Sequence, residues 1–280
     1  MNLAQKTFKI ADVHAHVFPE KLAVKAAGSI GAFYGTEMYC EASMEKLLEE
    51  EGKAGVSRYV ISSSAVTPKQ VPHILEFLSQ ARLGHPACIA FGSIYPGMDG
   101  FEDVLDELQS LGLRGLKIHP DFQKLPIDDE SCIGTYRSIA RRGLPVLMHM
   151  GDNRYDFSSP ERLTNLIRRV PDLVVIAAHF GGWNAWDQSL RHPQPENVFY
   201  DTSSTTPMIP YDMVMRLFDA LGPERFLFGT DFPMWSPSEM VWQFMQYDLG
   251  GSLREQILYG NFMKLFGLTD EPEKGEGTHV

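Results

Sequence analysis

Residues 10–16 read IADVHAH, an apolar, strand-like run that ends in two histidines. Side chains along a strand alternate between its two faces, so His14 and His16 point to the same side, roughly 7 Å apart along the chain. At that separation, two imidazoles can bind one metal ion. The stretch therefore predicts a strand that delivers two metal ligands at its carboxyl end.

Three later apolar runs also end in a residue that can bind a metal ion or a proton. They read VLMH at 146–149, VVIAAH at 174–179 and FLFGTD at 226–231. In a parallel barrel of alternating strands and helices, the carboxyl ends of all strands meet at one rim, where active sites are built. Four such strand ends favour that architecture.

Eight short apolar segments alternate with helix-like windows along the chain. Strands are expected near residues 8–14, 57–62, 88–94, 114–119, 144–149, 173–179, 197–202 and 225–231, with helices at 43–53, 68–83, 101–111, 128–142 and 158–170. Eight such units close into an α/β fold, the (β/α)8 TIM barrel of roughly 250 residues. A doubly wound open sheet is the alternative, but it keeps its first and last strands apart. We expect one barrel domain over residues 1–268 and a flexible tail over 269–280.

Composition excludes several classes of protein. The 280 residues are 44% hydrophobic and carry a net charge of -11, so we expect neither a nucleic-acid partner nor a membrane partner. The three cysteines form no C-x-x-C pair, which favours free thiols in a reducing compartment. No apolar run approaches the roughly 20 residues of a membrane span, and the first residues do not resemble a signal peptide. We expect a cytoplasmic protein with a small-molecule substrate and, as one possible assembly, a homodimer.

The strand-end residues form a candidate ligand set for one divalent ion. Two or more neutral imidazoles with a carboxylate suit Zn²⁺, and Mn²⁺ is the alternative. The expected ligands are His14, His16, His149 and Asp231. Such a site keeps a position open for water or substrate, as catalytic centres do. A two-metal centre bridged by a carbamylated Lys117 is the less favoured arrangement.

Three further polar residues are expected near these ligands. His179 ends the sixth strand, where it would orient or deprotonate the nucleophile, join the ligands or only support them structurally. Asp12 lies one layer deeper on the inward face, where it would hold a ligand or Lys117 in place. Lys117 would in turn pair with Asp12 or Asp231.

Loop residues are expected to contact the substrate. His119 would touch substrate or simply cap its loop, and Arg154 would bind a substrate carboxylate or remain solvated. Trp183, together with Phe33 and Tyr34 in a long first loop, would line a pocket for a ring or planar acid. Packing between loops or subunits is the alternative role of these aromatics.

The motifs taken together resemble the amidohydrolase-related family, amidohydrolase 2 type. The resemblance rests on DVHAH at 12–16, the histidines at 149 and 179, GTDFP at 229–233 and NFMKLF at 261–266. It spans nearly the whole chain and implies a metallo-dependent hydrolase type of barrel, with the four expected ligands on a divalent ion and His179 near the reacting group. It also implies two chemistries. Many members resemble hydrolases of esters, lactones or amides, and others, similar to aminocarboxymuconate-semialdehyde decarboxylase, remove CO₂ without redox chemistry.

We therefore expect a metal-dependent hydrolase acting on a small-molecule ester, lactone or amide through a metal-activated water. Asp231 would accept the water proton, and His179 would stabilise or move charge. The alternative is a metal-dependent non-oxidative decarboxylase, a carboxy-lyase of a small unsaturated or aromatic acid. A barrel that has lost catalysis and only binds a partner is a third hypothesis, and the intact ligand set argues against it.

Overall fold

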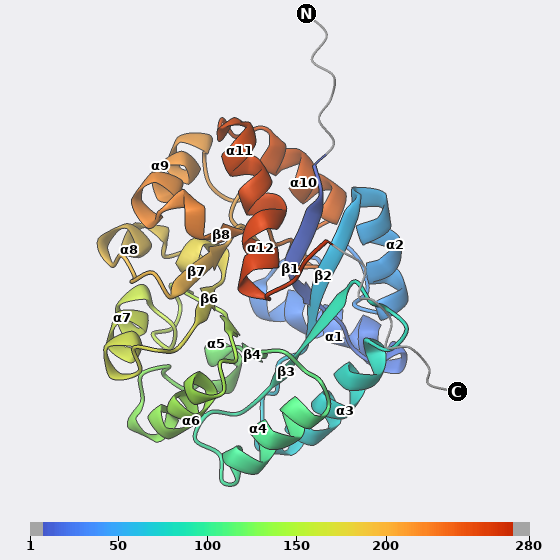
Figure 1. The fold of residues 1–280 in the computed structure, drawn as a ribbon, viewed down its shortest axis with the longest axis vertical. Coiled ribbons are helices and arrows are strands. Elements are labelled where there is room, and N and C mark those ends of the chain that lie inside the picture. Colours follow the sequence, from blue (N-terminus) through green and yellow to red (C-terminus); the bar gives the residue numbers. More distant parts are fainter. Residues whose placement is uncertain (1–7, 271–280) are drawn as a thin grey trace, which may run out of the picture.

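The computed structural model describes residues 8–270, which form one sheet of eight parallel strands in the order β1-β2-β3-β4-β5-β6-β7-β8. The strands are β1 (Ile10–His16), β2 (Val56–Ser62), β3 (Cys88–Ser93), β4 (Leu116–Ile118), β5 (Val146–Met148), β6 (Val175–Ala177), β7 (Val198–Asp201) and β8 (Phe226–Leu227). Each overlaps a segment expected from the apolar pattern. Helices surround the strands in Figure 1.

The sheet closes where β1 meets the segment that follows β8. The Val13 amide donates to the Phe228 carbonyl at 3.0 Å, and the Asp231 amide donates to the His14 carbonyl at 2.8 Å. A parallel bridge also joins Ala15 to Phe232. The expected TIM barrel is confirmed, and its closure brings the first and last expected ligands together.

Across the described residues, twelve helices surround the strands or cover the ends of the barrel. They are α1 (Glu20–Tyr34), α2 (Met44–Ala54), α3 (Val71–Ala81), α4 (Phe101–Ser110), α5 (Pro120–Gln123), α6 (Glu130–Arg141), α7 (Pro160–Arg169), α8 (Trp186–Arg191), α9 (Tyr211–Leu221), α10 (Pro237–Met245), α11 (Gly250–Glu255) and α12 (Asn261–Leu265). Short 3-10 turns lie at Pro68–Gln70 (η1), His179–Gly181 (η2) and Pro223–Arg225 (η3), and the π-helical turn η4 (Gln256–Gly260) leads into α12.

The expectation of a long first loop was wrong, because most of that segment forms α1. The buried face of this helix consists of Ala23, Ala27 and Gly31. Small residues of this kind produce little hydrophobic contrast, so the helical period is weak in the sequence. Phe33 and Tyr34 consequently stand on a helix.

The barrel interior has its own apolar core, which is closed at one end by α12. Phe91, Leu147 and Ile176 pack in one cluster with Phe262 and Phe266. Arg114, just before β4, donates to the Phe266 carbonyl at 2.5 Å, so α12 covers the amino-terminal ends of the strands. The opposite rim, at the carboxyl ends, is therefore the end left for a site.

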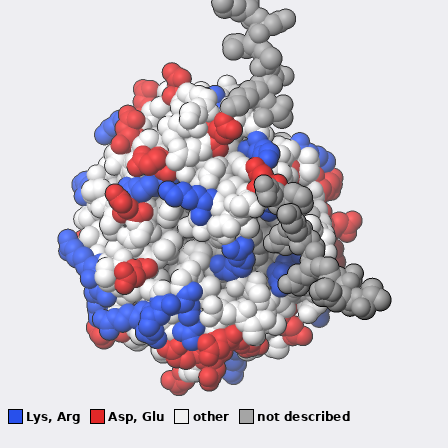
Figure 2. Space-filling model, in the orientation of Figure 1, with Lys and Arg blue, Asp and Glu red and all other residues white. Residues whose placement is uncertain are grey.

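The surface carries charges of both signs (Figure 2). On the face shown in Figure 2, lysine and arginine side chains form one connected group at the lower left, bordered by aspartate and glutamate, and elsewhere the two signs are scattered. In residues 8–270, no helix has both the length and the apolar character that crossing a membrane would need. Positions 271–280 of the expected tail lie outside the described residues.

Candidate active site

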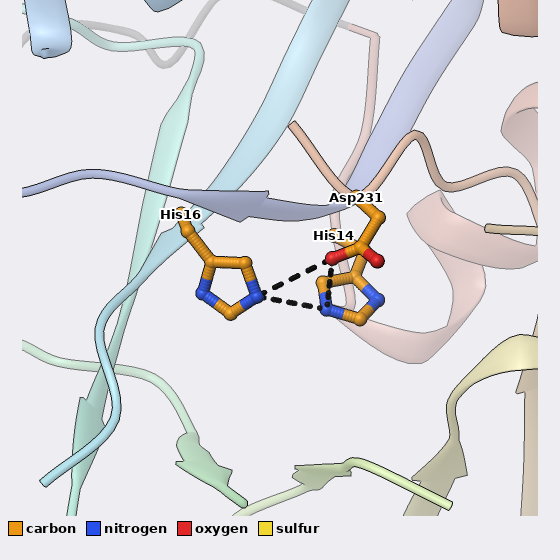
Figure 3. Close-up of side chains that lie close together, drawn as sticks. All are labelled: His14, His16 and Asp231. Carbon is orange, nitrogen blue, oxygen red and sulfur yellow. Dashed lines mark hydrogen bonds and ion pairs between the residues drawn. The ribbon is translucent and has the colours of Figure 1, made fainter. Parts of the chain in front are cut away.

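His14, His16 and Asp231 face one another at the carboxyl rim of the barrel, as Figure 3 shows. The two Nε2 atoms are 3.2 Å apart, and Asp231 Oδ1 lies 3.4 Å from His14 Nε2 and 3.5 Å from His16 Nε2. Donors about 2.1 Å from a tetrahedral ion stand about 3.4 Å from one another. The distances among the three donor atoms therefore match those expected around one divalent ion.

The protonation states of these donors also suit a cation. Burial lowers the pKa of His16 to about 4, so its imidazole is neutral and offers a lone pair near neutral pH. Burial alone would raise the pKa of Asp231, but His14 and His16 hold it well below its usual range. The set combines deprotonated donors with a negative charge, which is what metal binding requires.

Asp201, at the end of β7, orients the His14 ring. Its Oδ2 lies 2.8 Å from His14 Nδ1, and Ser203 Oγ lies 3.0 Å from the same nitrogen. Burial would raise the pKa of Asp201, but the interaction with His14 lowers it below its ordinary value, so the carboxylate is ionised and only accepts. Nδ1 of His14 therefore carries the hydrogen, and the lone pair of Nε2 faces Asp231.

We expect an Asp201→Asn variant to bind a divalent ion about 10- to 100-fold more weakly, because the amide no longer fixes the His14 tautomer. Competition with a chromophoric chelator, using Zn²⁺ and Mn²⁺ separately, measures the dissociation constant. Ser203→Ala is the matched comparison, since it removes a neutral partner of the same nitrogen and should weaken binding less. Equal affinities for wild type and Asp201→Asn would refute the orienting role.

Asp12 connects the two segments that carry the facing ligands. Its Oδ1 accepts from the His14 amide at 2.8 Å and from the Thr230 amide at 3.0 Å. Asp231, the next residue, has a left-handed backbone with φ of 62°. That conformation costs a non-glycine residue about 1 kcal/mol. The buried Asp12 carboxylate therefore helps to hold a strained turn that aims Asp231 at the imidazoles.

Lys117 also reaches the three-donor cluster. Its Nζ lies 2.7 Å from His14 Nε2, and the side chain is fully buried. Burial lowers the pKa of Lys117 to about 8, against the charges of Asp231 and Asp201. Its partner is thus His14, where we expected a direct pair with Asp12 or Asp231. A bound ion and the lysine proton would compete for the same lone pair.

His179 and His149 form a hydrogen-bonded relay beside this cluster. His179 Nδ1 lies 2.9 Å from Ser203 Oγ, and its Nε2 lies 3.1 Å from His149 Nδ1. Since Ser203 Oγ donates to Asp201 Oδ1 at 2.5 Å, it accepts the Nδ1 hydrogen of His179. His179 Nε2 then accepts from His149 Nδ1, which leaves the Nε2 lone pair of His149 free for a ligand.

His149 Nε2 is buried and has no hydrogen-bond partner among the described residues. It lies 3.6 Å from Asp121 Oδ2, and its close neighbours among possible ligands are His119 and Asp121. It is not within the tight group of His14, His16 and Asp231. Its role as fourth ligand stays a prediction, and that role requires its ring to move toward the other three.

His119 packs flat against His149, with ring centroids 4.1 Å apart and an interplanar angle of 9°. The lone pairs of parallel rings lie in parallel planes, so these two imidazoles are poorly placed to share an ion. His119 Nε2 is instead 2.7 Å from the Tyr34 hydroxyl, and both residues line the same cavity. We therefore keep His119 as a predicted substrate contact and assign no second ion.

Asp121 is a second buried carboxyl at this rim, and burial raises its pKa from 3.8 to about 7. The unfolded chain releases this proton above about pH 4, whereas the folded chain keeps it until about pH 7, so stability falls across that range. Between about pH 5 and pH 8, the wild type is expected to lose about 2 to 3 kcal/mol of unfolding free energy relative to Asp121→Asn. Urea denaturation at both pH values checks this, and identical pH dependence in the two proteins would contradict it.

Two expected substrate contacts pack behind residues that line the cavity. Arg154 forms an ion pair with Asp152, Nη2 to Oδ2 at 2.6 Å, and also donates to the Phe33 carbonyl at 2.7 Å. Trp183 packs against Tyr34 with ring centroids 4.9 Å apart. Neither Arg154 nor Trp183 is among the residues that line the cavity, so their contact with substrate stays a prediction.

A cavity of about 890 Å³ opens above the polar cluster. Its floor holds the polar side chains described above, and its walls are mainly apolar. The expected ligands and His179 all line it, as do Lys117 and His119. The expectation of a pocket at the barrel mouth therefore agrees with the structure. Asp201 and Ser203, which we did not predict, stand behind the floor.

Comparison with known proteins extends this description. A family model described as Amidohydrolase matches residues 11–268. None of the curated proteins compared with the chain matches it.

Three solved structures illustrate the likeness of fold. The 5-carboxyvanillate decarboxylase from Sphingomonas paucimobilis has a TM-score of 0.72 at 14% identity, over 94% of this chain and 100% of that one. A manganese-containing dihydroxybenzoic acid decarboxylase from Polaromonas sp. JS666 has a TM-score of 0.72 at 14% identity, over 93% and 97%. A proposed 2-pyrone-4,6-dicarboxylic acid hydrolase from Pseudomonas putida has a TM-score of 0.69 at 19% identity, over 95% and 100%. The TM-scores establish a shared fold, and identities this low establish nothing beyond the fold.

Proposed function

Because this chain belongs to the amidohydrolase family, whose model matches residues 11–268, we propose that it is a metal-dependent, non-oxidative decarboxylase of a small-molecule carboxylic acid. The observation that carries the proposal is the contrast within the cavity, where His14, His16 and Asp231 meet on the floor beneath mainly apolar walls. Apolar walls limit the water around the floor, so the Lys117 ammonium, together with a bound ion, would act more strongly on the negative charge left when CO₂ departs. Several proteins of the same fold carry decarboxylase names.

The same three residues would hold one divalent ion, with His149 as the proposed fourth ligand. A bound ion would supply positive charge that polarises the substrate oxygens. Two imidazoles and a carboxylate suit zinc, and the Polaromonas structure contains manganese, so these are the two ions to test. Binding of either ion requires a neutral imidazole at His16, which agrees with the lowered pKa of that side chain.

The protein's own residues would move the proton. Decarboxylation breaks the bond to the carboxyl carbon, the electron pair stays on the neighbouring carbon, and a proton replaces CO₂. Asp231 is ionised at rest, so it must first take a proton from the substrate or solvent and then return it to that carbon. The buried Lys117 side chain, when protonated, would stabilise negative charge on the substrate. His179, hydrogen-bonded to Ser203 and His149, would hold the His149 ring in place.

Hydrolysis of an ester, lactone or amide is the second candidate, and it was our first expectation from the sequence. The Pseudomonas putida neighbour, a proposed hydrolase, favours it, because its fold covers nearly all of this chain. In that reaction, Asp231 would take a proton from the attacking water, and His179 would stabilise the tetrahedral stage.

A panel assay separates the two reactions. The metal-loaded protein is incubated in D₂O with hydroxybenzoic and unsaturated dicarboxylic acids, and in parallel with lactones and esters of similar size. Release of CO₂ with deuterium at the former carboxyl-bearing carbon supports the decarboxylase. Lactone or ester cleavage without CO₂ would replace it with the hydrolase, and inactivity on every compound would favour the binding-protein hypothesis.

A further inference from the structure

The cavity above the candidate site extends well beyond the space that a single substituted ring needs. Its volume of about 890 Å³ lies near the top of the range of about 300 to 1,000 Å³ found for pockets that hold drug-sized ligands. His14 and Lys117 lie together on its floor. Other polar side chains that line the cavity are Lys21, Ser29, Gln70 and His73. Most of the lining surface is nevertheless apolar, so the additional space is bounded mainly by apolar side chains.

One wall of this space is a stripe along α1. Leu22, Ala26, Ile30 and Phe33 follow the spacing of one helix face, and all four line the cavity. The first and the last are eleven positions apart, a length of about 16 Å along the helix. This stripe differs from the buried stripe of small residues that packs α1 on the barrel.

The facing wall comes from the segment after β2 and from α3. Val66, Ile74 and Phe77 line the cavity there. Ile74 and Phe77 are three residues apart in α3, so they lie on the same face of that helix. Figure 1 shows α1 and α3 on the side of the barrel formed by β1, β2 and β3. Leu22 and Val66 are 44% and 38% exposed, so the apolar space is open to solvent.

We propose that the substrate carries a long apolar tail, an alkyl chain of six or more carbons or a second ring system, that lies between α1 and α3 while its acidic head sits on the floor. Apolar walls offer water no hydrogen bonds, whereas each methylene group of a ligand buried against them contributes about 0.8 kcal/mol to binding. The volume, the two apolar stripes and their continuity with the polar floor together define this class. The position of the head rests on the proposed function, but the tail site does not.

Calorimetric titration with hexanoate, octanoate and decanoate, below their micellar concentrations, tests the tail site without any turnover. The expected result is an affinity that rises about fourfold for each added methylene group until the space is filled. Equal affinity for hexanoate and decanoate would overturn the proposal.

Two tryptophan variants on α1 form a matched pair. Ala26 lines the cavity, whereas Ala32 is exposed on the same helix and does not line it. Ala26→Trp should remove most of the preference for decanoate, and Ala32→Trp should retain it. The same chain-length dependence in Ala26→Trp as in wild type would show that the acids bind elsewhere and would overturn the proposal. Ile74→Trp, on the facing wall, gives the same test if Ala26→Trp fails to fold.

The titrations also separate this proposal from the proposed reaction. Chain-length dependence in a protein that releases CO₂ from none of the acids of the panel would keep the tail site and refute the decarboxylase. Release of CO₂ from single-ring acids without any chain-length dependence would support the decarboxylase and refute the tail site.

Discussion

Asp231→Asn is expected to lower kcat by about 1,000-fold on whichever compound the substrate panel identifies. Asparagine nearly matches aspartate in size and keeps one oxygen toward the imidazoles, but it cannot accept a proton and return it. The left-handed backbone at residue 231 should persist, because asparagine tolerates that conformation. Turnover is measured with saturating metal, and elemental analysis of the variant confirms that the ion is bound.

The control for this variant is Asp187→Asn, which removes an exposed carboxylate paired with Arg191 on α8. It should retain wild-type turnover, since a surface ion pair contributes little. Near-wild-type kcat in a metal-loaded Asp231→Asn protein would remove the carboxylate from proton transfer and leave it only a ligand.

Much of the fold follows from local patterns in the sequence. The apolar runs that precede His149 and His179 are buried on both faces, and their order between helices predicts a closed parallel sheet. Strand ends were harder to place, because the last strand stops at Leu227 and Asp231 lies on the turn after it. Hydrogen bonds from the Thr230 segment to Asp12 shape that turn, and such long-range contacts leave no periodic signal.

The polar part of the site was predictable where its residues stand at strand ends. Asp201 ends β7 and follows the same rule, so inspecting every strand end would have found it. Ser203 reaches the site through the turn after β7, where the sequence carries no comparable pattern. Tyr34 lines the pocket as expected, but it does so from α1 and not from a loop. The actual partner of Lys117 depends on the positions of two distant strands, which local spacing does not determine.

Removal of the metal ion is expected to abolish turnover and to lower thermal stability. Dialysis against a chelator would remove the positive charge that polarises the substrate. The Lys117 ammonium would then remain hydrogen-bonded to His14 Nε2. An ion present at about 100 times its dissociation constant contributes about 2.7 kcal/mol to stability, so Tm should fall by several degrees.

Zn²⁺ or Mn²⁺ added back should restore both turnover and Tm in the wild type. In the Lys117→Met variant, no ammonium group competes with the ion for His14 Nε2. This variant should therefore bind metal more tightly than the wild type at pH 7. Because the pKa of Lys117 is lowered only to about 8, that advantage should shrink as the pH rises above it. Full turnover in wild-type protein shown by elemental analysis to be metal-free would mean that His14, His16 and Asp231 act on the substrate directly.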